Sequence, residues 1–338
     1  MKNIVFFDTK DYEMDFFDKY LKDKLNLVYE KSSLLPGGKI PEIAIHAEYI
    51  SVFTPSRLTK DVLKQFKNLK LIATRSVGFS HIDLDYCKEN GIKVVNTPHY
   101  GDYTIAEYSF GLLLNLVRKI SKAQEGLKSG ELSQEYEGTE LFGKTMGVIG
   151  IGGIGSKAIK IANGFSMDVI AYDIRQDEEL SKRENFKYVN LDELIERSDI
   201  ISLYAPATKD NYHLLNEEAF KKMKDGVFII NTARGELIDS QALYSELLSG
   251  KVAGAALDVV ECEEALNNKC NLFKDGECLD LNCLKRTLIN HKLMSLPNVI
   301  VTPHTAYDTK EATNRILEIT TNNIVEFLNN GNVLNQVL

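Results

Sequence analysis

A glycine-rich turn between a strand-like and a helix-like segment constrains the fold more than any other feature of the chain. Residues 146–149 are apolar, as in a buried strand, and Gly150-Ile151-Gly152-Gly153-Ile154-Gly155 follows them directly. Residues 156–162 then have the composition of a helix. In this G-x-G-x-x-G spacing the first glycine permits a tight turn, the second lets another group approach the backbone, and the third lets the helix pack closely on the strand. The segment therefore predicts one strand–turn–helix unit of a parallel α/β sheet.

The same turn predicts a dinucleotide site, because N–H groups and partial positive charge at a helix N-terminus bind phosphates. The residues expected at the pyrophosphate are Gly150, Gly152, Gly153, Ile154 and Gly155. Asp173 ends the next predicted strand, 18 residues after Gly155. A carboxylate there accepts hydrogen bonds from both hydroxyls of the adenosine ribose and repels a 2′-phosphate, which favours NAD over NADP. The nearby Arg175 leaves NADP open.

Strand-like and helix-like segments alternate along the chain, which is typical of parallel sheets covered by helices on both faces. The length of 338 residues favours two domains. In the first hundred residues a helix is predicted over Ser56–Phe66, and the predicted strands are Ile4–Asp8, Tyr49–Phe53, Leu71–Thr74 and Val94–Asn96. A second series of predicted strands comprises Thr145–Ile149, Val169–Tyr172, Ile200–Tyr204, Val227–Asn231, Ala253–Leu257 and Val299–Val301.

Two long amphipathic helices flank this second series. The first is predicted from about Thr104 to Ile120, with Thr104 and Glu107 as a capping box. The last helix is predicted over residues 310–328, ending near Gly331. Residues 262–292 are charged and poorly periodic, which predicts an extended loop and leaves room for a short helix. Loops of this length are often functional.

Charge and hydropathy exclude several classes of protein. The formal net charge is −8 and no basic stripe occurs, which argues against a nucleic-acid partner. No run approaches 18 consecutive apolar residues, and the apolar start Ile4-Val5-Phe6-Phe7 is too short for a signal peptide. We therefore expect a cytoplasmic protein with no membrane span.

The cysteines are too unevenly spaced for a typical zinc site. No Cys-x-x-Cys pair occurs among Cys87, Cys262, Cys270, Cys278 and Cys283. This pattern predicts free thiols and no bound metal.

Three charged or titratable residues, Arg234, Glu263 and His304, come shortly after the last three predicted strands. Ligands of open α/β sheets bind outside the carboxyl ends of the strands, so these side chains are expected to converge. Singly, each is usually an ordinary loop residue. Together, behind a nucleotide-binding turn, they indicate a catalytic site.

Reduction of a 2-keto acid requires a group of each of these three types. An arginine binds a carboxylate through two donors, so Arg234 suits the acid group. Reduction of the keto group needs a proton, which a histidinium at His304 supplies near neutral pH. A carboxylate at Glu263 stabilises the protonated histidine and fixes its orientation. The hydride belongs to the cofactor, so the predicted protein is a NAD-dependent dehydrogenase of small 2-hydroxy or 2-keto acids.

These motifs resemble those of the D-2-hydroxyacid dehydrogenase family over nearly the whole chain. The shared motifs are the glycine turn, Asn231-Thr232-Ala233-Arg234-Gly235, Leu257-Asp258-Val259 with Glu263, and Thr302-Pro303-His304. Similarity to the D-lactate dehydrogenase branch is carried by Tyr212-His213-Leu214-Leu215-Asn216, residues 237–242 and residues 302–307.

The resemblance implies roles residue by residue. Arg234 would bind the substrate carboxylate, His304 would be the acid–base residue with Glu263 as its partner, and Asp258 would lie against the nicotinamide carboxamide. The further cofactor positions that it implies are Tyr204, Pro206, Thr232 and Ala233.

The resemblance also implies substrate residues in the first hundred positions. Backbone amides of Val77 and Gly78 would hold the carboxylate, and Tyr100 would line the pocket. Phe53 falls where the family often places an aromatic ring over the substrate side chain. A bulky ring there favours a small substrate such as pyruvate, although Phe53 is equally typical of an ordinary core strand.

The fold class implied is α/β, with two doubly wound parallel-sheet domains. A Rossmann-type NAD-binding domain, residues 102–303, would be inserted into a flavodoxin-like substrate domain, residues 1–101 and 304–338. The cleft between the domains would close on the substrate, and a homodimer would form mainly through the cofactor domain.

Two features depart from the family pattern. Tyr204 stands, two residues before Pro206, where many relatives carry a histidine that faces the cofactor. The interval from Glu263 to His304 contains 40 residues and is longer than in close relatives, which leaves a larger substrate open. Cys262, next to Glu263, prompts the hypothesis that oxidants inactivate the protein.

Three functions stay open on the sequence. The first is NADH-dependent reduction of pyruvate to D-lactate, which Phe53 favours. The second is a dehydrogenase for larger branched or aromatic 2-keto acids. The third is a non-catalytic NAD-sensing protein, because the C-terminal-binding-protein corepressors resemble the enzymes in fold and at the same three residues.

Overall fold

The computed structural model describes residues 1–130, 136–263, 281–331 and 333–338. They form two compact units, Met1–Tyr100 with Thr309–Leu338, and Gly101–Asp308. The sequence pattern places these boundaries after residues 101 and 303. Cys270, Cys278 and residues 264–280 of the predicted loop lie outside the described residues.

The first unit is built on a five-stranded parallel sheet in the order β2-β1-β3-β4-β5. This is the strand order of flavodoxin-like doubly wound folds. Its strands are β1 (Lys2–Phe6), β2 (Leu25–Tyr29), β3 (Tyr49–Val52), β4 (Leu71–Thr74) and β5 (Lys93–Val95).

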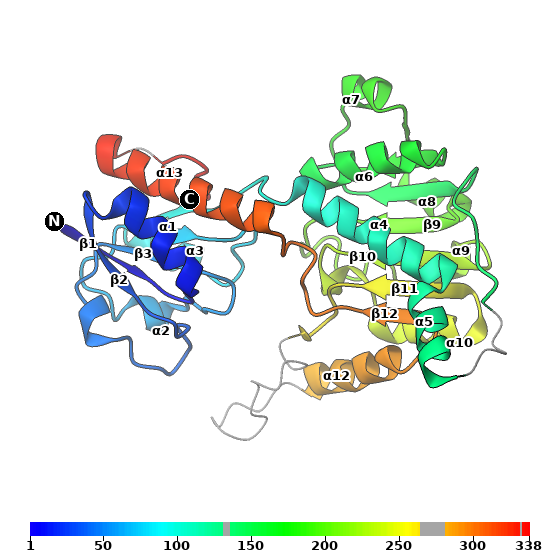
Figure 1. Ribbon diagram of the computed structural model, residues 1–338, viewed down its shortest axis with the longest axis horizontal. Helices are drawn as coiled ribbons and strands as arrows, with labels where there is room; N and C mark the ends of the chain where they lie inside the picture. The colour runs from blue at the N-terminus through cyan, green and yellow to red at the C-terminus, as the bar shows by residue number, and fades with distance from the viewer. Residues whose placement is uncertain (131–135, 264–280, 332) are drawn as a thin grey trace. The chain divides into compact units, whose positions relative to one another are not determined.

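Helices cover both faces of this sheet because successive strand residues point to opposite sides. Ile4 and Phe6 of β1 pack with α1 (Asp11–Leu21) and α13 (Lys310–Asn330). Val5 and its neighbours on that face pack with α2 (Lys60–Leu63) and α3 (Leu84–Glu89). Figure 1 shows how α13, in red, returns the C-terminal end of the chain to the unit formed by the first hundred residues.

The second unit contains a seven-stranded parallel sheet in the order β12-β11-β10-β9-β6-β7-β8. Its strands are β6 (Thr145–Ile149), β7 (Asp168–Tyr172), β8 (Lys187–Tyr188), β9 (Ile200–Leu203), β10 (Val227–Asn231), β11 (Val252–Leu257) and β12 (Val299–Val301). Read from β8, this is the Rossmann order, and the strand order reverses between β6 and β9. Ligands of such sheets bind at this reversal, beyond the carboxyl ends of the strands.

One face of this sheet is covered by α4 (Asp102–Arg118) and α6 (Gly153–Gly164), which lie in one layer in Figure 1. The opposite face packs on α8 (Leu191–Arg197), α9 (Glu217–Lys222), α10 (Ser240–Ser249) and α12 (Leu281–Met294). In the described part of the unit, the other helical elements are α5 (Ile120–Ser129), α7 (Glu178–Arg183) and the 3-10 turn η2 (Gly235–Leu237). Asp and Asn side chains cap α7, α8, α9 and α10, which explains where these helices begin.

Three local predictions are wrong. The capping box at Thr104 is not formed, because α4 begins at Asp102 after Gly101, and Thr104 is buried within its first turn. The helix predicted over Ser56–Phe66 starts only at Lys60, because the Ser56 hydroxyl is hydrogen-bonded to Asp8 and to the backbone of Leu34.

The third correction concerns the end of the predicted loop, where the 14-residue helix α12 is longer than the short helix expected there. Residues 264–280 of that loop lie outside the described residues. The packed side of α12 carries the polar residues Arg286 and Asn290 together with the apolar residues Ile289 and Leu293. Because polar and apolar residues share this face, the apolar period of the helix is weak in the sequence.

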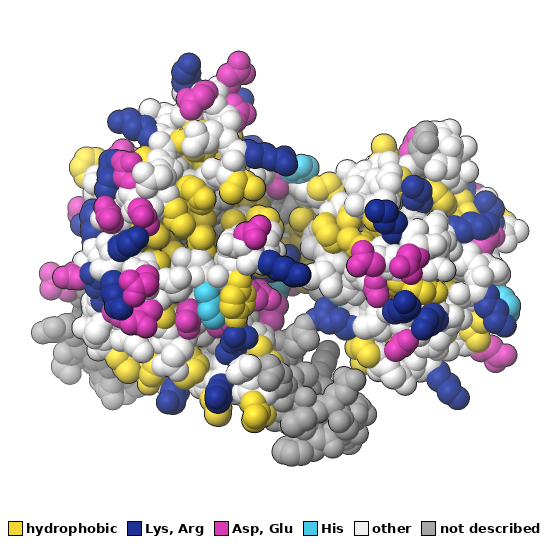
Figure 2. Space-filling model, turned by 180° about the vertical axis from the view of Figure 1, so that it is seen from behind, with side chains coloured by type: hydrophobic (Ala, Val, Ile, Leu, Met, Phe, Trp, Pro, Cys, Tyr) yellow, Lys and Arg dark blue, Asp and Glu magenta, His cyan; other side chains and the backbone are white. Residues whose placement is uncertain are grey.

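Among the described residues, no helix is long and apolar enough to cross a membrane. Figure 2 shows Lys and Arg side chains interspersed with Asp and Glu on the face drawn. Such mixed charge is typical of a protein surface without a large patch of one sign.

Candidate active site

The glycine turn lies between β6 and α6, at the reversal of the strand order. Gly150 has a φ of +91° and lies so close to β9 that a Cβ would stand 2.5 Å from the Ala205 nitrogen. A Cβ on Gly155 would stand 2.1 Å from the Gly150 carbonyl oxygen, and one on Gly153 would stand 2.2 Å from Asp102. Packing against backbone atoms therefore requires glycine at 150 and 155, whereas at Gly153 the neighbour is the end of a side chain that can move.

Gly152 is different, because a Cβ there would meet no atom within 4 Å and its φ is −83°. Nothing inside the described protein requires glycine at this position. Open space beside the backbone at the start of α6 fits the close approach of a pyrophosphate to the helix N–H groups. The turn thus fits the dinucleotide that the sequence predicts.

Asp173, at the end of β7, joins the turn through its carboxylate. Its Oδ2 accepts a hydrogen bond of 2.6 Å from the Ile151 N–H, and its Oδ1 accepts one of 2.9 Å from the Arg175 N–H. Arg175 thus contributes its backbone to the orientation of Asp173, and its side chain is exposed. The fixed carboxylate agrees with a ribose-binding role and with NAD.

The other predicted cofactor positions surround the ends of β9 and β10. Thr232 is buried, and its Oγ1 has no hydrogen-bond partner among the described residues, which leaves a polar atom for a ligand to satisfy. The Ala233 N–H donates to Asn231, so this turn is held by the strand before it. Pro206 is exposed. The Tyr204 hydroxyl is 2.7 Å from the Ser109 hydroxyl on α4, so its polar end is used inside the unit.

Asp258 is buried at the end of β11, and both its carboxylate oxygens bind the segment that carries His304. Thr302 Oγ1 donates to Oδ1 at 2.6 Å, and the N–H groups of Thr305 and Ala306 donate at 3.0 and 2.9 Å. The His304 N–H also donates to the Asp258 carbonyl. Asp258 therefore anchors the His304 loop, a role that the sequence does not reveal.

His304 has a φ of +54°, and its Nδ1 lies 2.8 Å from Oε1 of Glu263. Burial of the ring opposes its charged form, but the hydrogen bond and charge of Glu263 prevail, together with Asp258, and raise the pKa of His304 above its ordinary 6.5. The positive charge of Arg234 acts in the opposite direction. The structure therefore brings together His304, Glu263 and Arg234, as the sequence predicts.

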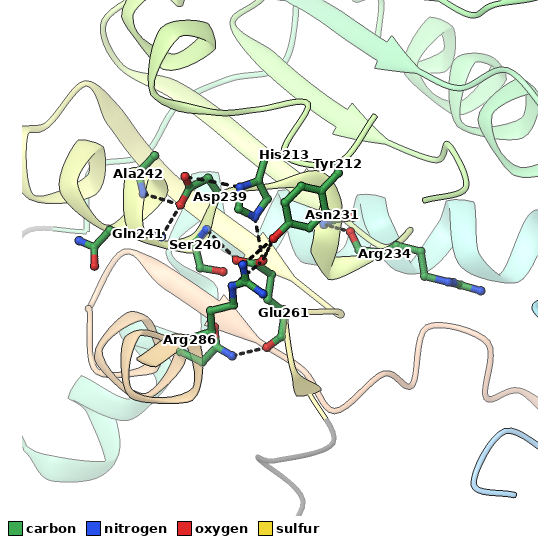
Figure 3. A network of polar contacts seen from close by, with 11 residues as sticks. Tyr212, His213, Asn231, Arg234, Asp239, Ser240, Gln241, Ala242, Glu261 and Arg286 are labelled. Carbon is green, nitrogen blue, oxygen red and sulfur yellow. Dashed lines mark hydrogen bonds and ion pairs between the residues drawn. The ribbon is translucent and has the colours of Figure 1, made fainter. Parts of the chain in front are cut away.

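Arg234 follows β10 and precedes η2. Its Nη1 donates to the Ala233 carbonyl at 2.6 Å, and its own carbonyl accepts from Asn231. The side chain is half-buried, and in Figure 3 the guanidinium points away from the group around Glu261. The remaining N–H groups of its fork suit a planar carboxylate.

The predicted substrate residues Phe53, Val77, Gly78 and Tyr100 belong to the first unit, beyond the carboxyl ends of its strands. The carbonyls of Val77 and Gly78 accept hydrogen bonds from Asn96 and Ser76. Their N–H groups have no hydrogen-bond partner among the described residues, which suits them to an anion.

Phe53 and the start of the Val77 loop are fixed by buried polar groups. The Phe53 N–H donates to Asp8 at 2.9 Å. Arg75 is fully buried and donates to Ser51 Oγ and to the Phe7 carbonyl, which ties together the ends of β1, β3 and β4. Tyr100 is largely buried, so little of it is exposed for a substrate.

Sequence reasoning missed a second polar cluster, centred on the buried Glu261 (Figure 3). Glu261 contacts His213, Arg286 and Ser240. The only signal in the sequence was an acidic residue two positions before Glu263. The sequence does not show that this residue is buried, so it gave no reason to single out Glu261. In the described ranges, no group of three or more His, Cys, Asp or Glu side chains is arranged to hold a metal ion.

Comparison with known proteins accounts for these features together. The family model for the NAD-binding domain of D-isomer specific 2-hydroxyacid dehydrogenases matches residues 110–306. This places the chain in the class of NAD-dependent oxidoreductases, with NAD as the cofactor. The chain belongs to the D-isomer specific 2-hydroxyacid dehydrogenase family, whose substrates are small 2-hydroxy and 2-keto acids.

Individual relatives extend over most of the chain. An aromatic 2-oxoacid reductase of Clostridium sporogenes is 42% identical over 89% of this chain and 88% of its own length. A D-lactate dehydrogenase of Lactiplantibacillus plantarum is 36% identical over 99% of this chain and 98% of its own. The crystal structure of a D-lactate dehydrogenase from Aquifex aeolicus, complexed with NAD and lactic acid, is 39% identical, covers 98% of this chain and 99% of its own, and has a TM-score of 0.85.

Proposed function

We propose that the protein is an NADH-dependent D-lactate dehydrogenase that reduces pyruvate to D-lactate. The observation that carries the reaction is the 2.8 Å contact between His304 Nδ1 and Glu263 Oε1. Because this contact raises the pKa of His304, the imidazole stays protonated to higher pH than an ordinary histidine. A protonated ring has a second donor at Nε2, which is available for a keto oxygen.

The three residues divide the work on a 2-keto acid. Arg234 binds the carboxylate through its fork and orients the keto carbon. NADH, when bound, supplies the hydride. His304 donates a proton to the keto oxygen as negative charge develops there, and Glu263 holds the ring and stabilises its charged form. In the reverse direction, neutral His304 accepts the proton of the hydroxyl group.

We assign the remaining predicted residues to binding. The amides of Val77 and Gly78 bind the carboxylate, and Tyr100 borders the substrate. Thr232, Ala233, Tyr204, Pro206 and Asp258 complete the surroundings of the cofactor, with Asp258 acting through the His304 loop. A homodimer formed through the cofactor unit and a cytoplasmic location are also part of the proposal.

Phe53 supports a small substrate. Its backbone N–H is hydrogen-bonded to Asp8, which fixes the main chain that carries the ring at the end of β3. The D-lactate dehydrogenases among the relatives cover almost the whole chain. The 42% identity to an aromatic 2-oxoacid reductase favours a second candidate, reduction of aromatic 2-keto acids.

A substrate panel separates the two candidates. NADH oxidation is measured with pyruvate, 2-ketobutyrate, 2-ketoisocaproate, phenylpyruvate and hydroxypyruvate, in the wild type and in Phe53→Leu. We expect pyruvate to have the highest kcat/KM, and the variant to shift the preference toward 2-ketoisocaproate by about tenfold. If phenylpyruvate has the highest kcat/KM in the wild type, the aromatic candidate is correct instead.

A further inference from the structure

Glu261 is the centre of a buried charged cluster outside the residues assigned above (Figure 3). Only 2% of its surface is exposed. Its Oε1 lies 2.8 Å from His213 Nε2 and 3.1 Å from Arg286 Nε, and its Oε2 accepts the Ser240 N–H at 3.2 Å. A buried carboxylate is stable only when it is paired and hydrogen-bonded, so these partners are required for its charge.

These contacts draw three elements to one point. Arg286 is on α12, His213 precedes α9, and Ser240 begins α10. Asn290, one turn beyond Arg286, donates to the Glu261 carbonyl at 2.6 Å. Side chain and backbone of Glu261 are thus both held by α12.

The cluster around Glu261 lies next to the proposed acid–base pair along the chain. Only Cys262, with a φ of +52°, separates Glu261 from Glu263. Arg286 is also hydrogen-bonded to Cys262. On the other side, a Cβ on Gly235 would stand 2.1 Å from the Val260 carbonyl carbon, so the chain before Glu261 rests against the residue after Arg234.

We propose that Glu261, Arg286 and His213 form a positioning network that holds Glu263 against His304. The inference rests on the function proposed above. Among the described residues, Glu263 is held to His304 through the contact between Oε1 and Nδ1, and only Cys262 separates it from Glu261. A shift of the 260–263 turn therefore lengthens the contact between Glu263 and His304.

Different charged groups surround His304 and Glu261, and this difference makes the pKa of His304 a test of the proposal. Glu263, Asp258 and Arg234 act on His304. His213, Arg286 and Tyr212 surround Glu261, and Asp239 lies 3.6 Å from His213 Nδ1. Loss of Arg286 changes a charge near Glu261 but none of the three groups that act on His304. A change in the titration of His304 would therefore report movement of Glu263.

The test compares Arg286→Gln with Arg286→Lys and with Lys285→Gln, which removes an exposed charge from the same helix. The pKa of His304 is measured by NMR on histidine-labelled protein, with its signal assigned by its loss in His304→Gln. We expect Arg286→Gln to lower this pKa by about one unit and to move the fall of kcat to lower pH by the same amount, with the KM for NADH unchanged. In Arg286→Lys the pKa of His304 should return most of the way to the wild-type value. In Lys285→Gln this pKa should equal that of the wild type.

An Arg286→Gln protein that keeps the wild-type pKa of His304 and the wild-type pH profile, even if its Tm falls, would overturn the proposal. If Arg286→Gln does not fold, His213→Gln gives the same readout, because it removes the other close partner of Glu261. Failure of the proposed function is distinguished separately, since it would appear as undiminished turnover in His304→Gln.

Discussion

At the scale of single residues, the protonation of His304 is the property on which the proposed chemistry depends. Burial opposes the imidazolium, whereas Glu263 and Asp258 favour it more strongly, and the pKa rises. Reduction of a keto acid needs the protonated ring, so its rate should be high below this pKa and fall above it. Oxidation of a hydroxy acid needs the neutral ring and should show the opposite dependence.

Glu263→Gln tests this balance directly. Without the carboxylate charge, burial prevails and the pKa of His304 falls, so the decline of reduction should move to lower pH by about 1 to 2 units. The measurement is kcat/KM for pyruvate against pH, with Glu196→Gln as an exposed control on α8. A Glu263→Gln profile that superimposes on that of the wild type contradicts this role of Glu263.

The surroundings of Cys262 disfavour its reactive form. Burial and the hydrogen bond to Cys283 raise the pKa of its thiol to about 12, so it stays protonated at neutral pH. The thiolate is the reactive form, which argues against the sequence-based hypothesis of oxidant sensitivity through Cys262. We expect peroxide at pH 7 to leave Cys262 unmodified in peptide mass spectra. Rapid oxidation at Cys262, with loss of activity that Cys262→Ser prevents, would restore that hypothesis.

At the scale of elements, the glycine turn separates residues required for packing from one that fits ligand binding. Gly155→Ala places a methyl group 2.1 Å from the Gly150 carbonyl and should destabilise the unit by about 1–3 kcal/mol. Gly152→Ala meets open space, so its Tm should stay near the wild type while its Kd for NADH rises roughly tenfold. Thermal unfolding and NADH fluorescence titration measure both effects. An unchanged Kd for Gly152→Ala shows that the pyrophosphate does not approach there.

Some helices and strands were predictable from the sequence and others were not. The buried strands of both sheets were predictable, because both of their faces are apolar and their ends are marked by turns. The edge strand β8 has only two residues, and α12 packs through Arg286 and Asn290 as well as Ile289 and Leu293, so the apolar pattern of both elements is weak. The residues Arg234, Glu263 and His304 were predictable as a set, whereas Glu261 was not, because its partners lie 21 to 48 residues away in sequence.

At the scale of the whole molecule, two doubly wound sheets supply different parts of one predicted reaction. The second unit contains the glycine turn, Asp173 and the His304–Glu263 pair. The first contains Phe53 and the Val77–Gly78 amides. The family is established by comparisons that cover nearly all of both units. The choice of substrate stays a proposal, in which Phe53 is the foremost side chain.

The central claim is that His304 transfers a proton during stereospecific reduction of pyruvate. Its most direct test is pyruvate reduction by NADH in the wild type and in His304→Gln, with the handedness of the lactate determined by chiral chromatography. We predict D-lactate from the wild type, and a kcat at least roughly 100-fold lower in His304→Gln with NADH binding intact. Undiminished turnover in His304→Gln, or L-lactate from the wild type, would contradict the account.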